Sequence, residues 1–399
     1  MRKMLIVLLA SALTALLPGL APGQVKDKIK IGFAMSLTGR FAPGAEGQHQ
    51  AYLLWAEEVN KKGGIFVKEE GKRLPVKLVF YDDRSLTDVT VKITEKLITD
   101  DKVDLMLGPY GTANLFAVVP VIEKYRMPTV ASTGASIKIR ELKTRYLWIT
   151  NPMMPDNVME ALVGLLKANR DKIRTVAVVY LQELYTRENL EFLIPYLKKE
   201  GYTPVLVKDY PAGVTDLSPL LSEVKAKNPD ALIALTYPAD SFVLTTQAKE
   251  VGLNPKFMYE LVGPAAVAFG PKFGPMTEGI ATMGHWSPKG PWPGAREFHD
   301  AYVARWKKKP DYLNSAEAYA AGQVLEQAIE RAGSLDREKI RGVLSTGVFM
   351  TINGPVRYDG PVLATVPAAV LQWQKGELEI IWPPKSATSP LLFPKPMWP

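Results

Sequence analysis

The sequence predicts an α/β protein built from two lobes, each a largely parallel sheet with helices on both faces. Three observations carry this prediction. Short apolar runs alternate with helical stripes, the alternation occurs in two successive series, and 399 residues are enough for two separate cores. A content of 47% hydrophobic and 23% charged residues is typical of folded proteins and excludes wholesale disorder.

The first 23 residues are typical of a secretory signal peptide. Arg2 and Lys3 form a positively charged n-region, and residues 4–17 form an almost wholly apolar h-region. Small residues follow, and we expect cleavage near Gly23 or Gln24. The apolar run of about 14 residues is shorter than the ~20 that a spanning helix needs. The chain has no Cys, so a lipid anchor on cysteine is impossible. We therefore expect an exported mature protein that is soluble.

The first α/β series runs from residue 28 to about 150. Its expected strands lie at 29–33, 76–81, 103–107 and 129–131. The helices between them are indicated by apolar positions at helical spacing: Ala51, Leu54, Trp55 and Val59; Val89, Ile93 and Leu97; Leu115, Val118, Val119 and Ile122.

The second series begins after a strand at 146–150. Its expected strands lie at 176–180, 205–207, 231–235 and 257–259, and its helices near 159–166, 187–199, 217–224 and 242–251. Three further helices are expected at 295–306, 315–332 and 337–344, followed by strands at 355–358 and 368–373. The proline-rich tail, 383–399, shows no periodicity and is expected to lie extended on the surface.

Composition and motifs exclude several functions. No Cys is present for a disulfide, a thiolate metal site or a cysteine nucleophile, and neither HExxH, GxSxG nor a P-loop occurs. The net charge of +8 is not gathered into basic runs with aromatics, so we expect no nucleic-acid partner. Asp82 and Asp83 are adjacent on a strand and point to opposite faces, which favours a turn or cap role over a shared acid/base site. We expect no cofactor and no metal.

Two small polar loops follow buried strands of the first series. Residues 107–114 combine Gly111 with Thr112 at the start of a helix, whose free N–H groups bind anions. Residues 131–136 include Thr133, Ala135 and Ser136. Because ligands of open α/β sheets bind at the carboxyl ends of strands, both loops are candidate ligand contacts. The alternative, two tight loops with ordinary helix caps, is equally compatible with the sequence.

The order and spacing of several segments resemble the branched-chain amino-acid binding proteins of bacterial ABC importers, which have the type I periplasmic binding fold. The segments are IKIGFAMSLTGRFAPGAEGQHQAYLLWAEEVNKKGGI, VKLVFYDDRS, VDLMLGPYGTAN, MPTVAS and QAKEVGL. The resemblance extends from about Lys28 to Pro383. It implies two Rossmann-like lobes joined by a three-stranded hinge that close on one solute and deliver it to a membrane permease.

The resemblance also implies the domain boundaries and the compartment. Lobe one would contain residues 24–151 and about 282–346, and lobe two residues 152–281 and about 347–382. The protein would be a periplasmic monomer that binds a small carboxylate and partners the permease of an ABC importer.

Site residues follow from the resemblance position by position. The hydroxyl that grips the ligand carboxylate falls on Thr112, and two ligand-facing tyrosines fall on Tyr185 and Tyr237. The threonine and the glutamate that bind the ligand ammonium fall on Ala135 and Leu261, which have neither group. Ser136 and Glu260 each lie one position away, and a one-residue shift would restore both. Arg40 is a further cation near the expected ligand, with solvation as the alternative.

We therefore expect a non-enzymatic solute-binding subunit for a small hydrophobic monocarboxylate, such as an aromatic or 2-oxo acid. Leucine-like amino acids are the alternative ligands, with Glu260 as the ammonium partner. Two other functions remain open: a sensor that passes closure to a receptor, and an exported enzyme that uses Asp82, Asp83 or Tyr185.

Overall fold

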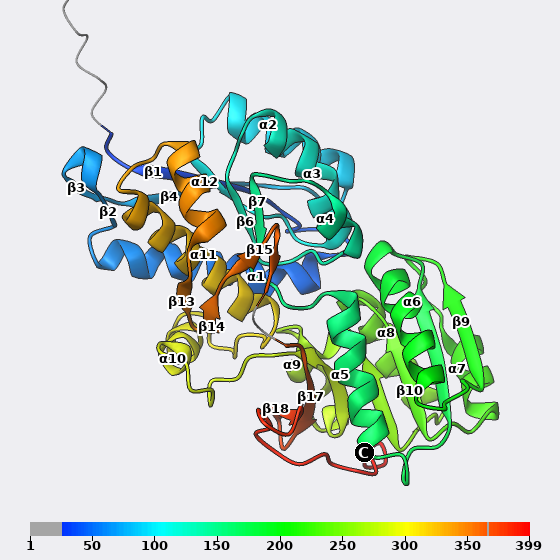
Figure 1. Ribbon diagram of the computed structural model, residues 1–399. Helices are drawn as coiled ribbons and strands as arrows, with labels where there is room; N and C mark the ends of the chain where they lie inside the picture. Colours follow the sequence, from blue (N-terminus) through cyan, green and yellow to red (C-terminus); the bar gives the residue numbers. More distant parts are fainter. Residues whose placement is uncertain (1–25, 365–366) are drawn as a thin grey trace, which may run out of the picture.

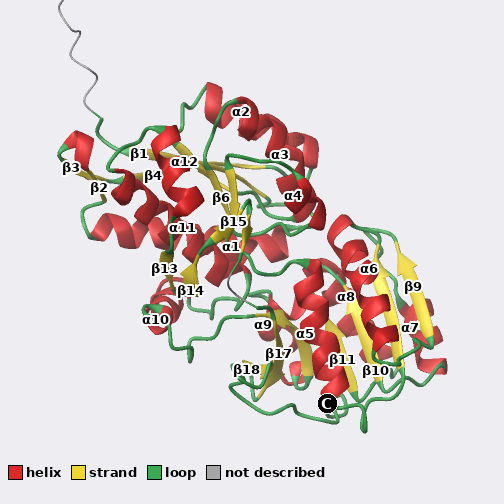
Figure 2. Ribbon diagram, viewed as in Figure 1, coloured by secondary structure: helices red, strands yellow, loops and turns green. Residues whose placement is uncertain are grey.

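The computed structural model describes residues 26–364 and 367–399, and it consists of two α/β lobes placed side by side (Figure 1). The expected signal peptide, 1–23, lies outside the described residues. Each lobe is one seven-stranded sheet with helices on both faces (Figure 2). Within the described part of the chain, no helix is both long and apolar enough to cross a membrane.

The sheet of lobe one has the strand order β15-β16-β7-β6-β5-β1-β4. Its strands are β1 (Ile29–Met35), β4 (Val76–Asp82), β5 (Leu105–Leu107), β6 (Thr129–Ala131), β7 (Leu147–Ile149), β15 (Tyr358–Asp359) and β16 (Val362–Leu363). Its helices are α1 (Ala42–Lys61), η1 (Lys68–Glu70), α2 (Thr87–Thr99), α3 (Thr112–Lys124), α4 (Ile137–Glu141), α10 (Ala295–Trp306), α11 (Asn314–Ala332) and α12 (Arg337–Thr346). Two hairpins complete the lobe: β2 (Ile65–Val67) with β3 (Lys72–Leu74), and β13 (Phe349–Thr351) with β14 (Gly354–Val356).

The sheet of lobe two has the strand order β18-β17-β12-β11-β10-β8-β9. Its strands are β8 (Val176–Leu181), β9 (Leu206–Tyr210), β10 (Ala231–Leu235), β11 (Phe257–Glu260), β12 (Ile280–Gly284), β17 (Ala369–Gln374) and β18 (Glu377–Trp382). Its helices are α5 (Pro155–Ala168), α6 (Leu184–Lys199), α7 (Ser218–Ala226), α8 (Pro238–Glu250), η2 (Gly263–Ala265), α9 (Phe269–Phe273) and η3 (Gly274–Thr277). β17 and β18 pair antiparallel, whereas β8 to β12 are parallel, as expected of strands joined through helices.

The chain returns to lobe one after β12, and α11 then packs along α1. Trp55 of α1 is buried at this contact, and a Cβ added at Gly322 would lie 2.4 Å from its ring. Only glycine therefore lets the two helices approach this closely. The packing brings the start of α11, about 200 residues further along the chain than α3, to the edge of lobe one that faces lobe two.

The last strands differ from the expected boundary between the lobes. We assigned residues 347–382 to lobe two, but β15 and β16 pair in the sheet of lobe one, where Val362 aligns with Ile149 of β7. Only β17 and β18 join lobe two. The two β15–β16 strands are two residues long, which is too short for an alternating pattern to reveal their partner.

The tail, 383–399, contains no helix or strand and lies against lobe two. The Trp398 Nε1–H donates to the Leu253 carbonyl at 2.8 Å, and the Lys395 N–H donates to the Lys256 carbonyl at 2.7 Å. These contacts fasten the end of the chain beside β11.

Candidate functional site

A small cavity lies between the lobes, at the carboxyl ends of their strands. Its lining residues are Tyr110, Gly111, Thr112, Thr133, Gly134, Ala135, Asn151, Tyr185, Tyr237, Val262, Met283, Leu313 and Asn314. The cavity volume is about 30 Å³, well below the usual range for small-molecule sites, so its walls must move apart to hold a ligand. We call it the central cavity.

The start of α3 forms the anion-binding wall of the central cavity. Gly111 precedes the helix with φ of 91°, a conformation that favours glycine, and no side chain caps the helix there. Among the described residues, the Ala113 N–H has no acceptor, and the Thr112 N–H faces the Tyr237 hydroxyl of lobe two. Free N–H groups and the positive end of the helix dipole both attract a carboxylate.

Thr112 is oriented by the neighbouring loop. Its Oγ1 accepts the Ala135 N–H at 3.1 Å, while the Ala135 carbonyl lies 3.4 Å away, which is long for a hydroxyl hydrogen bond. The Tyr237 hydroxyl of lobe two is a further neighbour, so a ligand that enters between the lobes competes with these contacts for the hydroxyl proton. The side chain is buried, with 2% exposed.

Thr133 fixes the two loops of lobe one to each other. The Gly111 N–H donates to its Oγ1 at 3.2 Å, and the Gln48 Oε1 of α1 accepts from it at 3.0 Å. The Gln48 Nε2 donates in turn to the Gly108 carbonyl at 3.0 Å. Thr133 therefore holds the two loops in position and does not bind the ligand through its hydroxyl, which already accepts and donates hydrogen bonds within the protein.

Lobe two contributes two buried tyrosines. The Tyr237 hydroxyl faces Thr112 across the cleft. The Tyr185 hydroxyl donates to the Met153 carbonyl at 2.7 Å, so its ring forms a wall and its polar end is satisfied. Burial raises the pKa of both phenols, as it does for Tyr110, and keeps them uncharged at neutral pH.

Asn314, at the start of α11, supplies a donor without a partner. The residue is 3% exposed, and its Nδ2 has no hydrogen-bond partner in the described chain. An unpaired buried donor costs about 1–3 kcal/mol, so a ligand oxygen at this atom would be stabilising. Asn151 also lines the cavity, but its Oδ1 accepts the Met153 N–H at 2.6 Å.

Six of the eight residues proposed from the sequence line the central cavity, and two do not. Ser136 lies outside it: its Oγ accepts the Lys138 N–H at the start of α4 and donates to Glu188 of lobe two at 2.7 Å. Glu260 is fully buried on the other side of β11, where it accepts from the Thr245 hydroxyl of α8 at 2.7 Å. The expected contact of Glu260 with a ligand ammonium is therefore wrong for this arrangement, and Val262 lines the cavity instead.

Strand geometry explains the position of Glu260. Glu260 is the last residue of β11, and its side chain lies on the face that α8 covers, where it meets Thr245 and not the cavity. Its burial, as the largest effect, raises the pKa of Glu260 to about 7.

The lobes touch at the rim of the central cavity. Arg40 forms an ion pair with Glu183 across the cleft, and the ring of Phe41 lies 5.5 Å from that of Tyr237. The Glu188 carboxylate accepts from Ser136 and from the Ile137 N–H at 3.2 Å. Arg40 thus bridges the lobes and is not a lining residue. The structure represents a closed arrangement of the lobes.

The paired aspartates have structural roles. Asp82 accepts the N–H groups of Leu37, Thr38 and Arg84, and Asp83 accepts from Ser36, Ser85 and Thr90. Neither lines the central cavity. The described residues contain no group of His, Asp or Glu arranged to hold a metal ion.

Two α/β lobes with a closed cavity at facing strand ends define a type I periplasmic binding fold. A family model described as "Periplasmic binding protein" matches residues 28–377. The chain therefore belongs to the periplasmic binding protein family, and its fold and relatives are those of the branched-chain amino-acid type.

Three similar proteins illustrate the family. The leucine-, isoleucine-, valine-, threonine- and alanine-binding protein of Pseudomonas aeruginosa is 26% identical over 353 residues, covering 88% of this chain and 91% of that protein. A branched-chain amino-acid transporter substrate-binding protein of Streptococcus pneumoniae, in complex with isoleucine, has a TM-score of 0.77 at 21% identity and covers 89% and 100%. A solute-binding protein of R. palustris, in complex with benzoate, has a TM-score of 0.77 at 17% identity and covers 92% and 98%.

Several lining residues escape sequence reasoning. Tyr110 lies within the loop that the sequence singled out, but Asn151, Met283, Leu313 and Asn314 carry no local signal. Asn151 and Met283 lie where the chain passes from one lobe to the other, and Leu313 and Asn314 lie at the start of α11, which packs in lobe one.

Proposed function

We propose that this chain is the periplasmic solute-binding component of an ABC importer and that its ligand is a small hydrophobic monocarboxylate without an ammonium group. An aromatic or 2-oxo acid has the required chemistry. Membership of the periplasmic binding protein family supports the general role. The signal peptide expected at residues 1–23 supports the compartment.

One observation carries the choice of ligand: none of the residues that line the central cavity has a charged side chain. A carboxylate finds neutral donors there, namely the N-terminus of α3, Thr112 and the unpaired Asn314 amide. An ammonium would find no carboxylate. Burying an unpaired ammonium costs several kcal/mol, so the cavity should discriminate against amino acids.

Leucine-like amino acids are the second candidate, because the relative from Pseudomonas aeruginosa and the Streptococcus pneumoniae structure are described with such ligands. The benzoate complex of the R. palustris protein supports the first candidate. The same fold thus accepts both classes in different proteins.

A thermal-shift panel on refolded, ligand-stripped protein tests the proposal. Leucine, isoleucine, valine and phenylalanine are paired with their 2-oxo acids, and benzoate is added. A ligand at 100 times its dissociation constant stabilises the fold by about 2.7 kcal/mol. We expect stabilisation by acids without an ammonium. Preference for the amino acids over their 2-oxo partners would reject the proposed ligand class.

Two further measurements test the role. Small-angle scattering should detect compaction when the bound acid closes the lobes, and the acid should be recovered unchanged after incubation. Turnover of the acid would favour an exported enzyme. Uptake into vesicles that contain the permease would separate an importer subunit from a sensor.

A further inference from the structure

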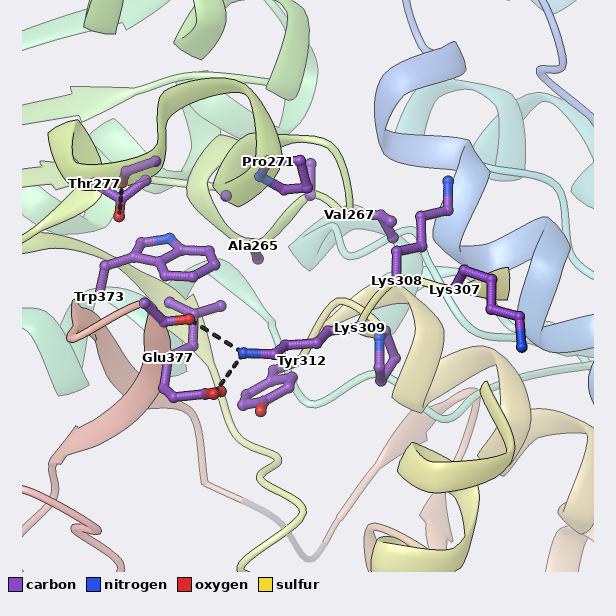
Figure 3. A pocket seen from close by; sticks show the side chains of 16 residues that line it. Ala265, Val267, Pro271, Thr277, Lys307, Lys308, Lys309, Tyr312, Trp373 and Glu377 are labelled. Carbon is purple, nitrogen blue, oxygen red and sulfur yellow. Dashed lines mark hydrogen bonds and ion pairs between the residues drawn. The ribbon is translucent and has the colours of Figure 1, made fainter. Parts of the chain in front are cut away.

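A second and larger pocket lies beside the central cavity, on the flank of the cleft. Lobe one contributes the loop after α10, residues 307–312, and lobe two contributes residues 265–277 and 373–378. The cavity volume between these walls is about 330 Å³. The next two residues, Leu313 and Asn314 at the start of α11, line the central cavity. We call this space the lateral pocket; Figure 3 shows its lining side chains.

A fixed indole forms one wall of the lateral pocket. The Trp373 Nε1–H donates to the Pro264 carbonyl at 2.9 Å. Behind the ring, a Cβ added at Gly270 would lie 2.6 Å from its edge, so the backbone of α9 packs directly against it. A ring held in one orientation offers a planar ligand a stacking surface at little conformational cost.

The other walls combine apolar groups with positive charge. Tyr312, Val267, Pro271 and Leu378 supply apolar surface, and three consecutive lysines, residues 307–309, stand at the edge. Among the lining residues, Glu377 is the one acidic side chain. The lining therefore has a formal excess of positive charge, part of which pairs with Glu377 and with Glu46 of α1.

The Lys309 ammonium lies at the wall of the lateral pocket that β18 contributes. Its Nζ pairs with Glu377 of β18 and donates to the Gly376 carbonyl at 3.3 Å, as the dashed lines of Figure 3 show. A lysine ammonium has three N–H donors, and these two contacts leave one for a ligand oxygen. Lys308, in contrast, turns to Glu46 of α1.

We infer that the lateral pocket is a second ligand site that takes a planar aromatic monoanion, with the ring stacked on Trp373 and the anionic group on the Lys309 ammonium. The inference does not depend on which ligand fills the central cavity. Because both lobes form the pocket, its occupant favours the closed arrangement of the lobes.

The test uses 2-naphthoate as the probe and fluorine NMR of the full mature chain labelled with 5-fluorotryptophan. The chain has eight Trp residues, and Trp373→Phe identifies the resonance of residue 373. We expect a saturable shift of this resonance with 2-naphthoate. The uncharged amide, 2-naphthamide, should need about tenfold more ligand for the same shift, because it cannot pair with the Lys309 ammonium.

Variants separate the lateral pocket from other effects. Lys309→Met keeps the apolar stem and should raise the dissociation constant of 2-naphthoate about tenfold. The matched control is Lys289→Met, which removes an ion pair to Glu379 on the same strand, β18, but does not line the pocket. It should change binding less than twofold. Thr112→Val, in the central cavity, should also leave the Trp373 titration unchanged.

Four results would overturn the inference. The first two concern the wild type: the Trp373 resonance stays unmoved at millimolar 2-naphthoate, or 2-naphthamide binds as tightly as 2-naphthoate. The other two concern the variants: Lys309→Met and Lys289→Met lose binding equally, or Thr112→Val loses binding. The comparison of acid and amide uses unaltered protein, so it decides the question even if a variant folds poorly.

Discussion

Replacing Thr112 with valine removes one hydroxyl from the central cavity and changes the side-chain shape little. In the structure this hydroxyl accepts the Ala135 N–H at 3.1 Å and lies near the Ala135 carbonyl and the Tyr237 hydroxyl, which a ligand oxygen would replace as partners of its proton. A hydrogen bond to a charged group contributes about 1.5–3 kcal/mol. The affinity for the acid that stabilises the protein most in the thermal-shift panel should therefore fall about 10- to 150-fold.

The same substitution has a separate cost to folding. The buried Ala135 N–H loses its acceptor in Thr112→Val, and an unsatisfied buried donor costs about 1–3 kcal/mol of the free energy of unfolding. Thr112→Ser restores both contacts and should recover affinity and stability together. Thr94→Val is a matched control, because its buried hydroxyl donates to the Thr90 carbonyl within α2, away from the cavity. It should lower stability alone.

Isothermal titration calorimetry measures the affinity, and urea unfolding measures the stability. If Thr112→Val binds within twofold of the wild type, Thr112 does not hold the carboxylate. The reasoning also fails if Thr112→Ser binds as weakly as Thr112→Val, since the hydroxyl would then not be the group that matters.

Three other substitutions test the electrostatics. Asn314→Asp places a carboxylate in the neutral cavity and should weaken an acid at least tenfold while weakening the matching amino acid less; equal losses in calorimetry would contradict this. Burial raises the pKa of Glu260 from 4.5 to about 7, so the folded state binds this proton more tightly than the unfolded state does. The free energy of unfolding should therefore fall by about 3 kcal/mol as the pH rises from about 4.5 to about 7. In urea unfolding, the difference between the wild type and Glu260→Gln should follow that fall, and a difference independent of pH would refute it. Arg40→Ala breaks a half-exposed ion pair between the lobes and should speed ligand release two- to fivefold in stopped-flow experiments, less at high salt. An unchanged release rate would mean that the pair does not hold the lobes closed.

The sequence predicts the parts of the fold that rest on local patterns. The run at 231–235 is a wholly buried parallel strand in the structure, the run at 176–180 is buried except for the partly exposed Tyr180, and Thr112 starts the helix that follows a buried strand of lobe one. Strand ends in parallel sheets meet at one edge, so the loops after them were predictable as neighbours.

Other features depend on contacts between distant segments. The residue type of Asn314 gives no hint of a cavity, because only the packing of α11 on α1 brings it there. Glu260 ends β11 and Val262 follows it in the loop, and the four residues of β11 are too few to fix its faces and its end from the pattern alone. The pairing of β15 and β16 with the sheet of lobe one could not be predicted for the same reason, because each strand has only two residues.

The central claim is that the cavity holds a carboxylate and has no partner for an ammonium. Leucine and its 2-oxo acid, 4-methyl-2-oxopentanoate, have the same side chain and the same carboxylate. They differ at the α-carbon, which has an ammonium group in leucine and a carbonyl oxygen in the 2-oxo acid. Paired calorimetric titrations of ligand-stripped protein should give one site per chain for the 2-oxo acid and at least tenfold weaker binding of leucine. Tighter binding of leucine than of its 2-oxo acid would contradict the claim.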